Sequence, residues 1–297
     1  MLTRRAAVFG PLLLGVLSAT GTLAQGIRSS AVAGRVVSLD LLLTEILISL
    51  GVRPLAVANI PLYRRLVAEP PVPEGTPELG PLNEPNLEFL QKLAPDLILA
   101  ATWQAIGLAR IGEIAPVLWL PNAVRGKPAL EHVFALMETI GERTGRQAEA
   151  QAWRGRLEQA LDAARVRLAG YDGRPLYVVR FMDDARHAAI FRGGMIGDVM
   201  DRLGLRNAWG GTTNVSGVAT IGIEQLAGDK DARLIHFHRG VETDRALGRL
   251  ADSPFWRALP VVRAGRVEAM PVIYPNGAAV TAIRFAEQLS EALVRHD

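Results

Sequence analysis

The sequence contains few residue patterns that could carry out covalent chemistry. It has no cysteine, which excludes thiolate nucleophiles, iron–sulfur clusters, cysteine zinc sites and disulfides. It also has no Gly-x-Ser-x-Gly elbow, phosphate loop or His-Glu-x-x-His motif. Asp183 and Asp184 are adjacent, and neighbouring side chains on a strand point to opposite faces, so they do not form an acid/base pair. We therefore expect no enzyme.

Two histidines have a spacing that suits metal binding. His236 and His238 flank Phe237 in an apolar run, so on a strand their side chains would share one face. A metal site needs at least a third nitrogen or oxygen ligand, and none is evident in the sequence. We expect no metal site, and we keep His238, near the end of the run, as a candidate ligand contact.

Composition and length are those of a globular protein with two domains or lobes. It has 297 residues, 49% of them hydrophobic, and 33 basic against 30 acidic residues. The length is enough for two domains that each bury a core. No run of Lys and Arg accompanies the net charge of +3, so we expect no nucleic-acid partner.

The first residues have the pattern of an export signal. Arg4 and Arg5 precede the apolar stretch 6–20, and small residues at 22–24 follow it. A charged start, a short apolar segment and small exit residues are typical of a secretory signal peptide. We therefore predict a signal peptide over 1–24, cleaved near Ala24 after Sec or twin-arginine export, and a periplasmic mature protein.

Further along the chain, short apolar runs alternate with segments of helical periodicity, which indicates α/β architecture. We expect strands at 36–39, 55–58, 97–100, 117–120, 176–180, 188–191, 233–237 and 267–270, and helices at 41–50 and 278–294. Apolar residues at intervals of three or four over 148–168 predict one long helix. The proline-rich segment 59–85 is expected to be a stiff, ordered loop.

These elements predict two lobes with a cleft between them. The N-terminal α/β lobe would span 25–142, a connecting backbone helix 143–170, and the C-terminal α/β lobe 171–297, each lobe with a central, mainly parallel sheet. Ligands usually bind in such clefts. The two halves also share one detail: Glu88 and Glu224 each open a short helix about ten residues before a buried strand. The helix dipole favours each glutamate locally, but it does not explain why both halves have one.

Several motifs resemble those of a known family. The sequences Arg-Val-Val-Ser-Leu (35–39), Glu-Pro-Asn-Leu-Glu (84–88) and Leu-Ala-Pro-Asp-Leu (93–97), with the long helix, resemble periplasmic binding proteins of metal-chelate ABC importers. In particular, the segments 63–64, 69–71, 184–187, 207–209 and 262–266 resemble the iron(III)-hydroxamate binding proteins for ferrichrome-type siderophores. The resemblance implies a class III periplasmic binding protein fold.

The resemblance also implies ligands and partners. The ligand would be an iron–siderophore complex of the hydroxamate type, bound without any cofactor by a monomer. The partner would be the permease of an ABC importer in the inner membrane, and Glu88 and Glu224 match the two glutamates that dock to it. A carboxylate siderophore, haem or a corrinoid is the alternative ligand, and a secreted siderophore-processing enzyme is the alternative function.

Residue types, loop positions and the resemblance together predict the ligand contacts. They are Tyr63, Arg64, Leu82, Asn83, Trp103, Gln104, Arg192, Ser216, His238, Tyr274 and Asn276. Leu82 stands where the family has an arginine that points at the iron-bound hydroxamate oxygens. Proteins of the family also carry tryptophans and tyrosines in the cleft. The corresponding positions in this sequence are Leu66, Ser216, Tyr274 and Asn276. Arg64 or Arg65 could supply the missing cation.

Overall fold

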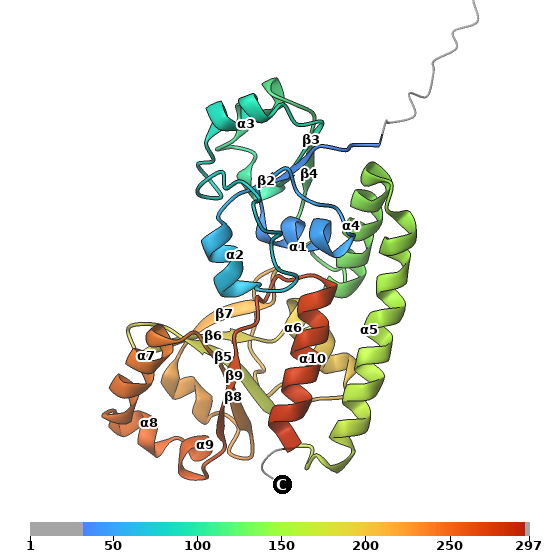
Figure 1. Cartoon of the computed structure of the whole chain (residues 1–297). Coiled ribbons are helices and arrows are strands. Elements are labelled where there is room, and N and C mark those ends of the chain that lie inside the picture. Colours follow the sequence, from blue (N-terminus) through green and yellow to red (C-terminus); the bar gives the residue numbers. More distant parts are fainter. Residues whose placement is uncertain (1–31, 295–297) are drawn as a thin grey trace, which may run out of the picture. The chain divides into compact units, whose positions relative to one another are not determined.

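The computed structural model describes residues 32–294 (Figure 1). The predicted signal peptide over 1–24 and its cleavage near Ala24 lie outside the described residues. The strands are β1 (Val36–Ser38), β2 (Ala56–Val57), β3 (Leu97–Ala101), β4 (Val117–Leu120), β5 (Leu176–Phe181), β6 (His187–Phe191), β7 (Val218–Gly222), β8 (Arg233–His238) and β9 (Val267–Pro271). The α-helices are α1 (Leu41–Ser49), α2 (Ile60–Leu66), α3 (Leu87–Leu93), α4 (Ala129–Thr144), α5 (Gln147–Arg167), α6 (Gly194–Arg202), α7 (Val241–Ala251), α8 (Pro254–Ala258), α9 (Pro260–Arg263) and α10 (Ala279–Val294).

The N-terminal lobe has a four-stranded sheet in the order β2-β1-β3-β4. All of its strand pairs are parallel. Helix α1 begins directly after β1, and Asp40 caps it by accepting hydrogen bonds from the N–H groups of Leu42 and Leu43. This is the α/β arrangement that the alternating pattern predicts, and it brings the carboxyl ends of all four strands to one edge of the sheet.

The C-terminal lobe has a five-stranded sheet in the order β7-β6-β5-β8-β9. Strands β5, β8 and β9 are parallel, whereas β6 pairs antiparallel with both β5 and β7. The sheet is therefore mixed, and β6 is the one strand of the five that runs against the others. The physical reason is the short connection 182–186, because a parallel crossover needs a dozen or more residues.

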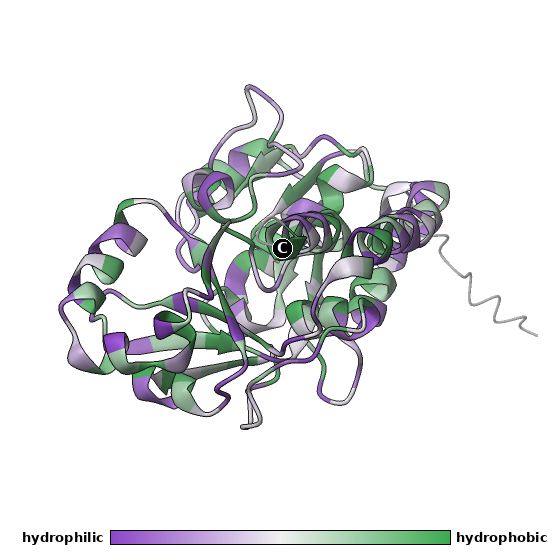
Figure 2. Ribbon diagram, turned by 90° about the horizontal axis from the view of Figure 1, so that it is seen from below, coloured by the Kyte–Doolittle hydropathy of each residue, from purple (hydrophilic) through white to green (hydrophobic). Residues whose placement is uncertain are grey.

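Long helices connect the two sheets. The predicted periodicity over 148–168 corresponds to α5, which packs against α10 and α4 (Figure 1). The largest buried apolar cluster extends from Val36 in the first sheet to Phe237 in the second, through residues of these helices. Figure 2 shows apolar residues concentrated in the interior and hydrophilic residues on the outer helices. Since the lobes share this core, large hinge movements between them are disfavoured.

The proline-rich segment is partly helical, which corrects the expectation of a loop. Asn59 accepts a hydrogen bond from the Leu62 N–H at 3.1 Å and so caps α2. Pro61 lies in the first turn, where its missing N–H costs no helical hydrogen bond. The rest of the segment up to 85 has no further helix, and within residues 32–294 no helix is both long and apolar enough to span a membrane.

Candidate ligand-binding cleft

The carboxyl ends of the N-terminal strands form one wall of a cleft. Asp40 follows β1, Trp103 follows β3 and Asn122 follows β4. The Asp40 Oδ2 accepts hydrogen bonds from Trp103 Nε1 at 3.3 Å and from Asn122 Nδ2 at 3.1 Å. The carboxylate that follows β1 therefore holds residues that follow two other strands, at the edge where open α/β sheets bind ligands.

Asp40 is itself buried, whereas Trp103 is accessible. Burial raises the pKa of Asp40, and hydrogen bonds from Asn122, Leu43, Trp103 and Leu42 offset only part of that increase. Trp103 is 52% exposed, so its ring is held by Asp40 but remains free to contact a ligand. Asp40 was not among the predicted residues. The signal that could have found it is an aspartate directly after a strand and before a helix.

The opposite wall is built at the carboxyl edge of the C-terminal sheet. Arg180 lies near the end of β5, Arg239 directly follows β8, and residues 272–276 follow β9. They line a cavity of about 230 Å³ together with Phe191, Phe237 and, from the N-terminal lobe, Leu66. The sequence pattern does not single out either arginine, because Arg180 lies within β5, Arg239 follows β8, and only the parallel pairing of these strands brings the two together.

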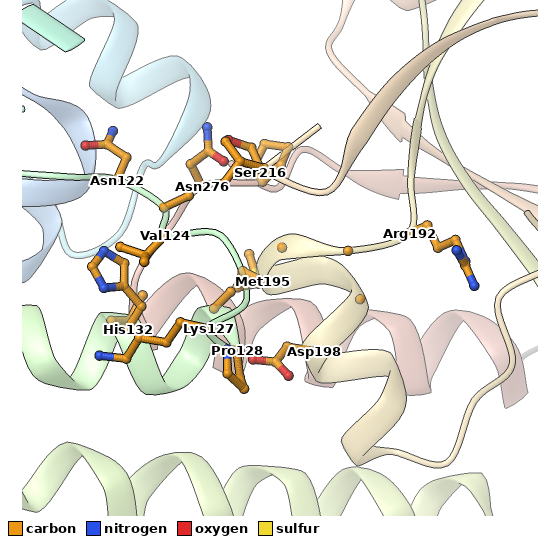
Figure 3. A pocket seen from close by; sticks show the side chains of 18 of the residues that line it. Asn122, Val124, Lys127, Pro128, His132, Arg192, Met195, Asp198, Ser216 and Asn276 are labelled. Carbon is orange, nitrogen blue, oxygen red and sulfur yellow. The ribbon is translucent and has the colours of Figure 1, made fainter. Parts of the chain in front are cut away.

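A second cavity, of about 170 Å³, adjoins the first where both contain Asn276. Its lining also includes Asn122, Ser216 and the start of α6 (Figure 3). Arg192 lies at the edge of this cavity, and its side chain points away from Asn122 and Ser216 (Figure 3), with Nη1 3.3 Å from the Gly211 carbonyl oxygen. The predicted residues Ser216, Tyr274 and Asn276 thus lie in adjoining cavities.

Direct contacts join the two lobes at the cleft. Arg65 of α2 forms an ion pair with Glu242 of α7, with Nη1 and Oε1 2.9 Å apart. The other oxygen of Glu242 lies 3.2 Å from Nη1 of Arg239. Tyr274 packs against the N-terminal cluster that contains Leu41, and burial raises its pKa. Of the two arginines considered in 59–85, the one that reaches the other lobe is therefore Arg65.

Two of the residues predicted as ligand contacts have buried side chains in the structure. Tyr63 is 0% exposed and donates a hydrogen bond from its hydroxyl to the Pro70 carbonyl at 2.8 Å. Gln104 is 2% exposed. Its amide accepts from the Ala101 N–H at 2.8 Å and donates to the Leu39 carbonyl at 3.0 Å. Both side chains stabilise loops of the N-terminal lobe.

His238 is also not available in the predicted way. Its Nε2 lies 3.0 Å from the Asp244 carboxylate, and its Nδ1 accepts from the Gly240 N–H at 3.2 Å, so both ring nitrogens have partners. His236 is 3% exposed, and burial followed by the nearby His238 lowers its pKa to about 4. Among residues 32–294, no group of three or more histidine and carboxylate side chains is placed to hold a metal ion.

The predicted contacts Arg64, Leu82 and Asn83 lie outside the two cavities. Leu82 is half-buried and packs against two apolar clusters of the N-terminal lobe. Arg64 and Asn83 are exposed and belong to neither of the two cavities. Leu82 therefore provides an apolar surface where the family resemblance implies a cation.

The two glutamates predicted to dock lie outside the cleft. Glu88 is in the first turn of α3, and Glu224 is in a short 3₁₀ helix, Ile223–Ala227, that follows β7. Both side chains are exposed. Neither has an ion-pair partner among the described residues, so both carboxylates are accessible to another protein.

Comparison with known proteins agrees with this architecture. The family model for periplasmic binding proteins matches residues 36–274. The iron(3+)-hydroxamate-binding protein FhuD of Escherichia coli (strain K12) is 29% identical over 260 residues, which cover 87% of this chain and 86% of that protein. The structure of the siderophore-binding protein FhuD from Vibrio cholerae, with bound Fe3+-Desferal, has a TM-score of 0.78 and 28% identity, covering 88% of this chain and 98% of the other.

A more distant structure shares the fold alone. SirA of Staphylococcus aureus, solved with staphyloferrin B, has a TM-score of 0.64 at 18% identity and covers 88% of this chain and 93% of its own. The family match spans most of the chain and includes both sheets that form the cleft. The chain therefore belongs to the family of periplasmic binding proteins.

Proposed function

We propose that this protein binds a ferric siderophore of the hydroxamate type in its cleft and delivers it to an ABC importer. The observation that carries the proposal is a cleft between the carboxyl edges of two sheets in a chain 28–29% identical to two proteins named for this class of ligand. Iron enters as part of the ligand and not as a resident cofactor. The protein is a carrier and catalyses no reaction.

The proposed contacts come from both walls. Trp103 covers an apolar face of the chelate, and Ser216, Tyr274 and Asn276 provide hydrogen bonds. Among the other residues expected at the site, Arg64, Leu82, Asn83 and Arg192 form its rim. Most of the binding free energy would come from shape and apolar contact, with few polar groups fixing the orientation, as is usual for small-molecule sites.

The proposal includes the location and the partner. After removal of 1–24, the mature protein would act in the periplasm as a monomer with lobes at 25–142 and 171–297, connected by 143–170. Glu88 and Glu224 would dock on the permease of the importer, one glutamate from each lobe. Exposed ion pairs contribute only about 0–1 kcal/mol each, which suits a contact that must form and break with every transport cycle.

A tryptophan-fluorescence titration with a ferric hydroxamate tests the proposal. We expect micromolar or tighter binding with quenching, because ferric chelates absorb in the emission range of tryptophan. Trp103→Phe should remove most of the quenching, whereas Trp153→Phe should not, since Trp153 lies on α5 with its Nε1 bonded to the Ser49 carbonyl. Trp103→Ala should weaken affinity about tenfold. Equal quenching in the wild type and in Trp103→Phe would contradict this placement of the ligand.

A further inference from the structure

Arg180 is a cation without a partner in the cleft. It lies opposite Ala189 in the β5–β6 pair, on the sheet face that lines the 230 Å³ cavity. Its side chain is half-buried. Within residues 32–294 it makes no hydrogen bond and no ion pair. A guanidinium loses hydration when it is buried, and this cost is recovered only when an anion or an acceptor contacts it.

Arg239 places a second guanidinium in the same cavity. Its side chain is 13% exposed, and its Nε is buried without a hydrogen-bond partner among the described residues. The pKa of Arg180 is lowered, first by burial and then by Arg239. Arg239 therefore destabilises the charge of Arg180 in the ligand-free protein.

The carboxylates nearby do not balance these cations. Glu242 contacts Arg239, but it also pairs with Arg65 at 2.9 Å, so one carboxylate serves two guanidiniums. Glu242 and Asp183 act on Arg180 only through longer-range attraction, and Asp183 is exposed to solvent. Three arginines and one contacting glutamate leave an excess of positive charge at the opening of the cleft.

The rest of the cavity lining is mainly apolar. Phe191, Phe237 and Val218 surround the arginines. A neutral chelate offers partial negative charge on its oxygen atoms, whereas a carboxylate offers a full charge and two oxygens that match a guanidinium. Because two cations face one apolar cavity, a full negative charge fits this wall better than a neutral chelate does.

We propose that Arg180 and Arg239 bind a carboxylate of the ligand, so that the chelate carried by this protein is a ferric siderophore with a carboxylate in addition to its hydroxamates. This inference rests on the proposed function and narrows its ligand class. It also accounts for the leucine at position 82, where the family resemblance implies an arginine. The positive charge that the N-terminal wall lacks is supplied by two arginines on the opposite wall.

Calorimetric titration of the wild-type mature protein with three ferric chelates tests the proposal. The chelates are a citrate-based dihydroxamate that carries a carboxylate, a neutral trihydroxamate, and desferrioxamine B, whose complex has a pendant ammonium. The carboxylate chelate should bind about tenfold more tightly than the neutral one, and the cationic chelate most weakly. Raising the salt from about 0.05 to 0.5 M should reduce these differences, because salt screens partly exposed charges.

Substitutions test whether Arg180 and Arg239 are the residues that bind the carboxylate of the chelate. Arg180→Gln and Arg239→Gln should each weaken binding of the carboxylate chelate about tenfold and change binding of the neutral chelate less than about twofold. Arg180→Lys keeps the positive charge and should lose less affinity for the carboxylate chelate than Arg180→Gln does. Arg257→Gln is the matched control, since Arg257 is exposed on α8 and lines neither cavity of the cleft. Circular dichroism of each variant checks that it is folded.

Two results would overturn the inference and leave the proposed function intact. In the first, the neutral or the cationic chelate binds as tightly as the carboxylate chelate. In the second, the arginine variants weaken all three chelates equally, which would assign the guanidiniums to the hydroxamate oxygens that the chelates share. If no ferric chelate binds the folded wild-type protein, the proposed function fails together with this inference.

Discussion

Reversing the charge of both exposed glutamates, with Glu88→Arg and Glu224→Arg, is expected to reduce iron–siderophore uptake at least about tenfold and to leave ligand affinity unchanged. Each glutamate is exposed in the first turn of a short helix, one in each lobe. Their contacts with arginines of a permease would be individually weak, but like charges placed opposite each other cost several kcal/mol in an interface. Uptake of radioactive iron by cells that contain the importer measures the effect, and titration of the purified variant measures affinity.

The matched control for this experiment reverses two other exposed acids. Glu142 on α4 and Asp252 at the end of α7 are both exposed, so Glu142→Arg with Asp252→Arg changes the net charge equally. This control should transport normally. Equal uptake by the Glu88/Glu224 variant and the control would show that the two glutamates do not dock, and loss of ligand binding in the variant would show that they act in the cleft.

The second large effect is expected at Glu45, which ties α1 to the start of α10. Glu45 is 0% exposed. Its Oε2 accepts from the Ala278 N–H and the Thr281 hydroxyl, and its Oε1 accepts from the Thr281 N–H, all at 2.9 Å. Glu45→Ala leaves these buried donors without a partner and should lower the free energy of unfolding by about 3 kcal/mol or more. Denaturant unfolding measures this change, and an unaltered midpoint would contradict it.

Glu45 also predicts a pH dependence of stability. Burial raises its pKa from 4.5 to about 7, and the hydrogen bonds from Ala278 and Thr281 offset only part of that increase. The folded protein therefore binds a proton at Glu45 between pH 4.5 and about 7 that the unfolded chain does not. The contribution of this proton to the free energy of unfolding is fully present below pH 4.5 and is lost as the pH rises through about 7. The free energy of unfolding changes by about 3 kcal/mol over this range.

Glu45→Gln isolates this contribution, because glutamine has nearly the same size and does not titrate. His236 has a lowered pKa and acts in the opposite direction, and Asp40 has a raised pKa and acts in the same direction, so the wild-type curve alone mixes several groups. In the difference in unfolding free energy between wild type and Glu45→Gln, the contributions of the other titrating groups cancel. It should fall as the pH rises from 4.5 to 8, and a flat difference would contradict the raised pKa.

Much of the fold is predictable from local patterns, because periodicity reports which side chains are buried. The four N-terminal strands and α5 lie within two residues of their expected positions. Strand β7 was missed, since Val218–Gly222 is only partly buried and lacks a continuous apolar run. Helix α2 lies in a segment whose many prolines favour a loop, but Asn59 caps the helix and Pro61 lies in its first turn.

The candidate site was less predictable, since it depends on residues that only the topology brings together. Arg180 and Arg239 are 59 positions apart in sequence and meet because β5 and β8 are parallel neighbours. Asp40 contacts residues that follow β3 and β4. Conversely, Tyr63 and Gln104 have side-chain types common in binding sites, but local folding turns both into the core. Residue type and position in a loop do not determine the direction of a side chain.

Isothermal titration calorimetry of the mature protein, with iron-loaded and iron-free forms of the same hydroxamate siderophores, tests the central claim most directly. We predict one site per chain, with micromolar or tighter affinity for at least one ferric complex and much weaker binding of the iron-free form, because only the metal folds the siderophore into the compact shape that the cleft receives. If no ferric hydroxamate binds to the folded protein, or if the iron-free form binds equally well, this protein is not a carrier of ferric hydroxamates.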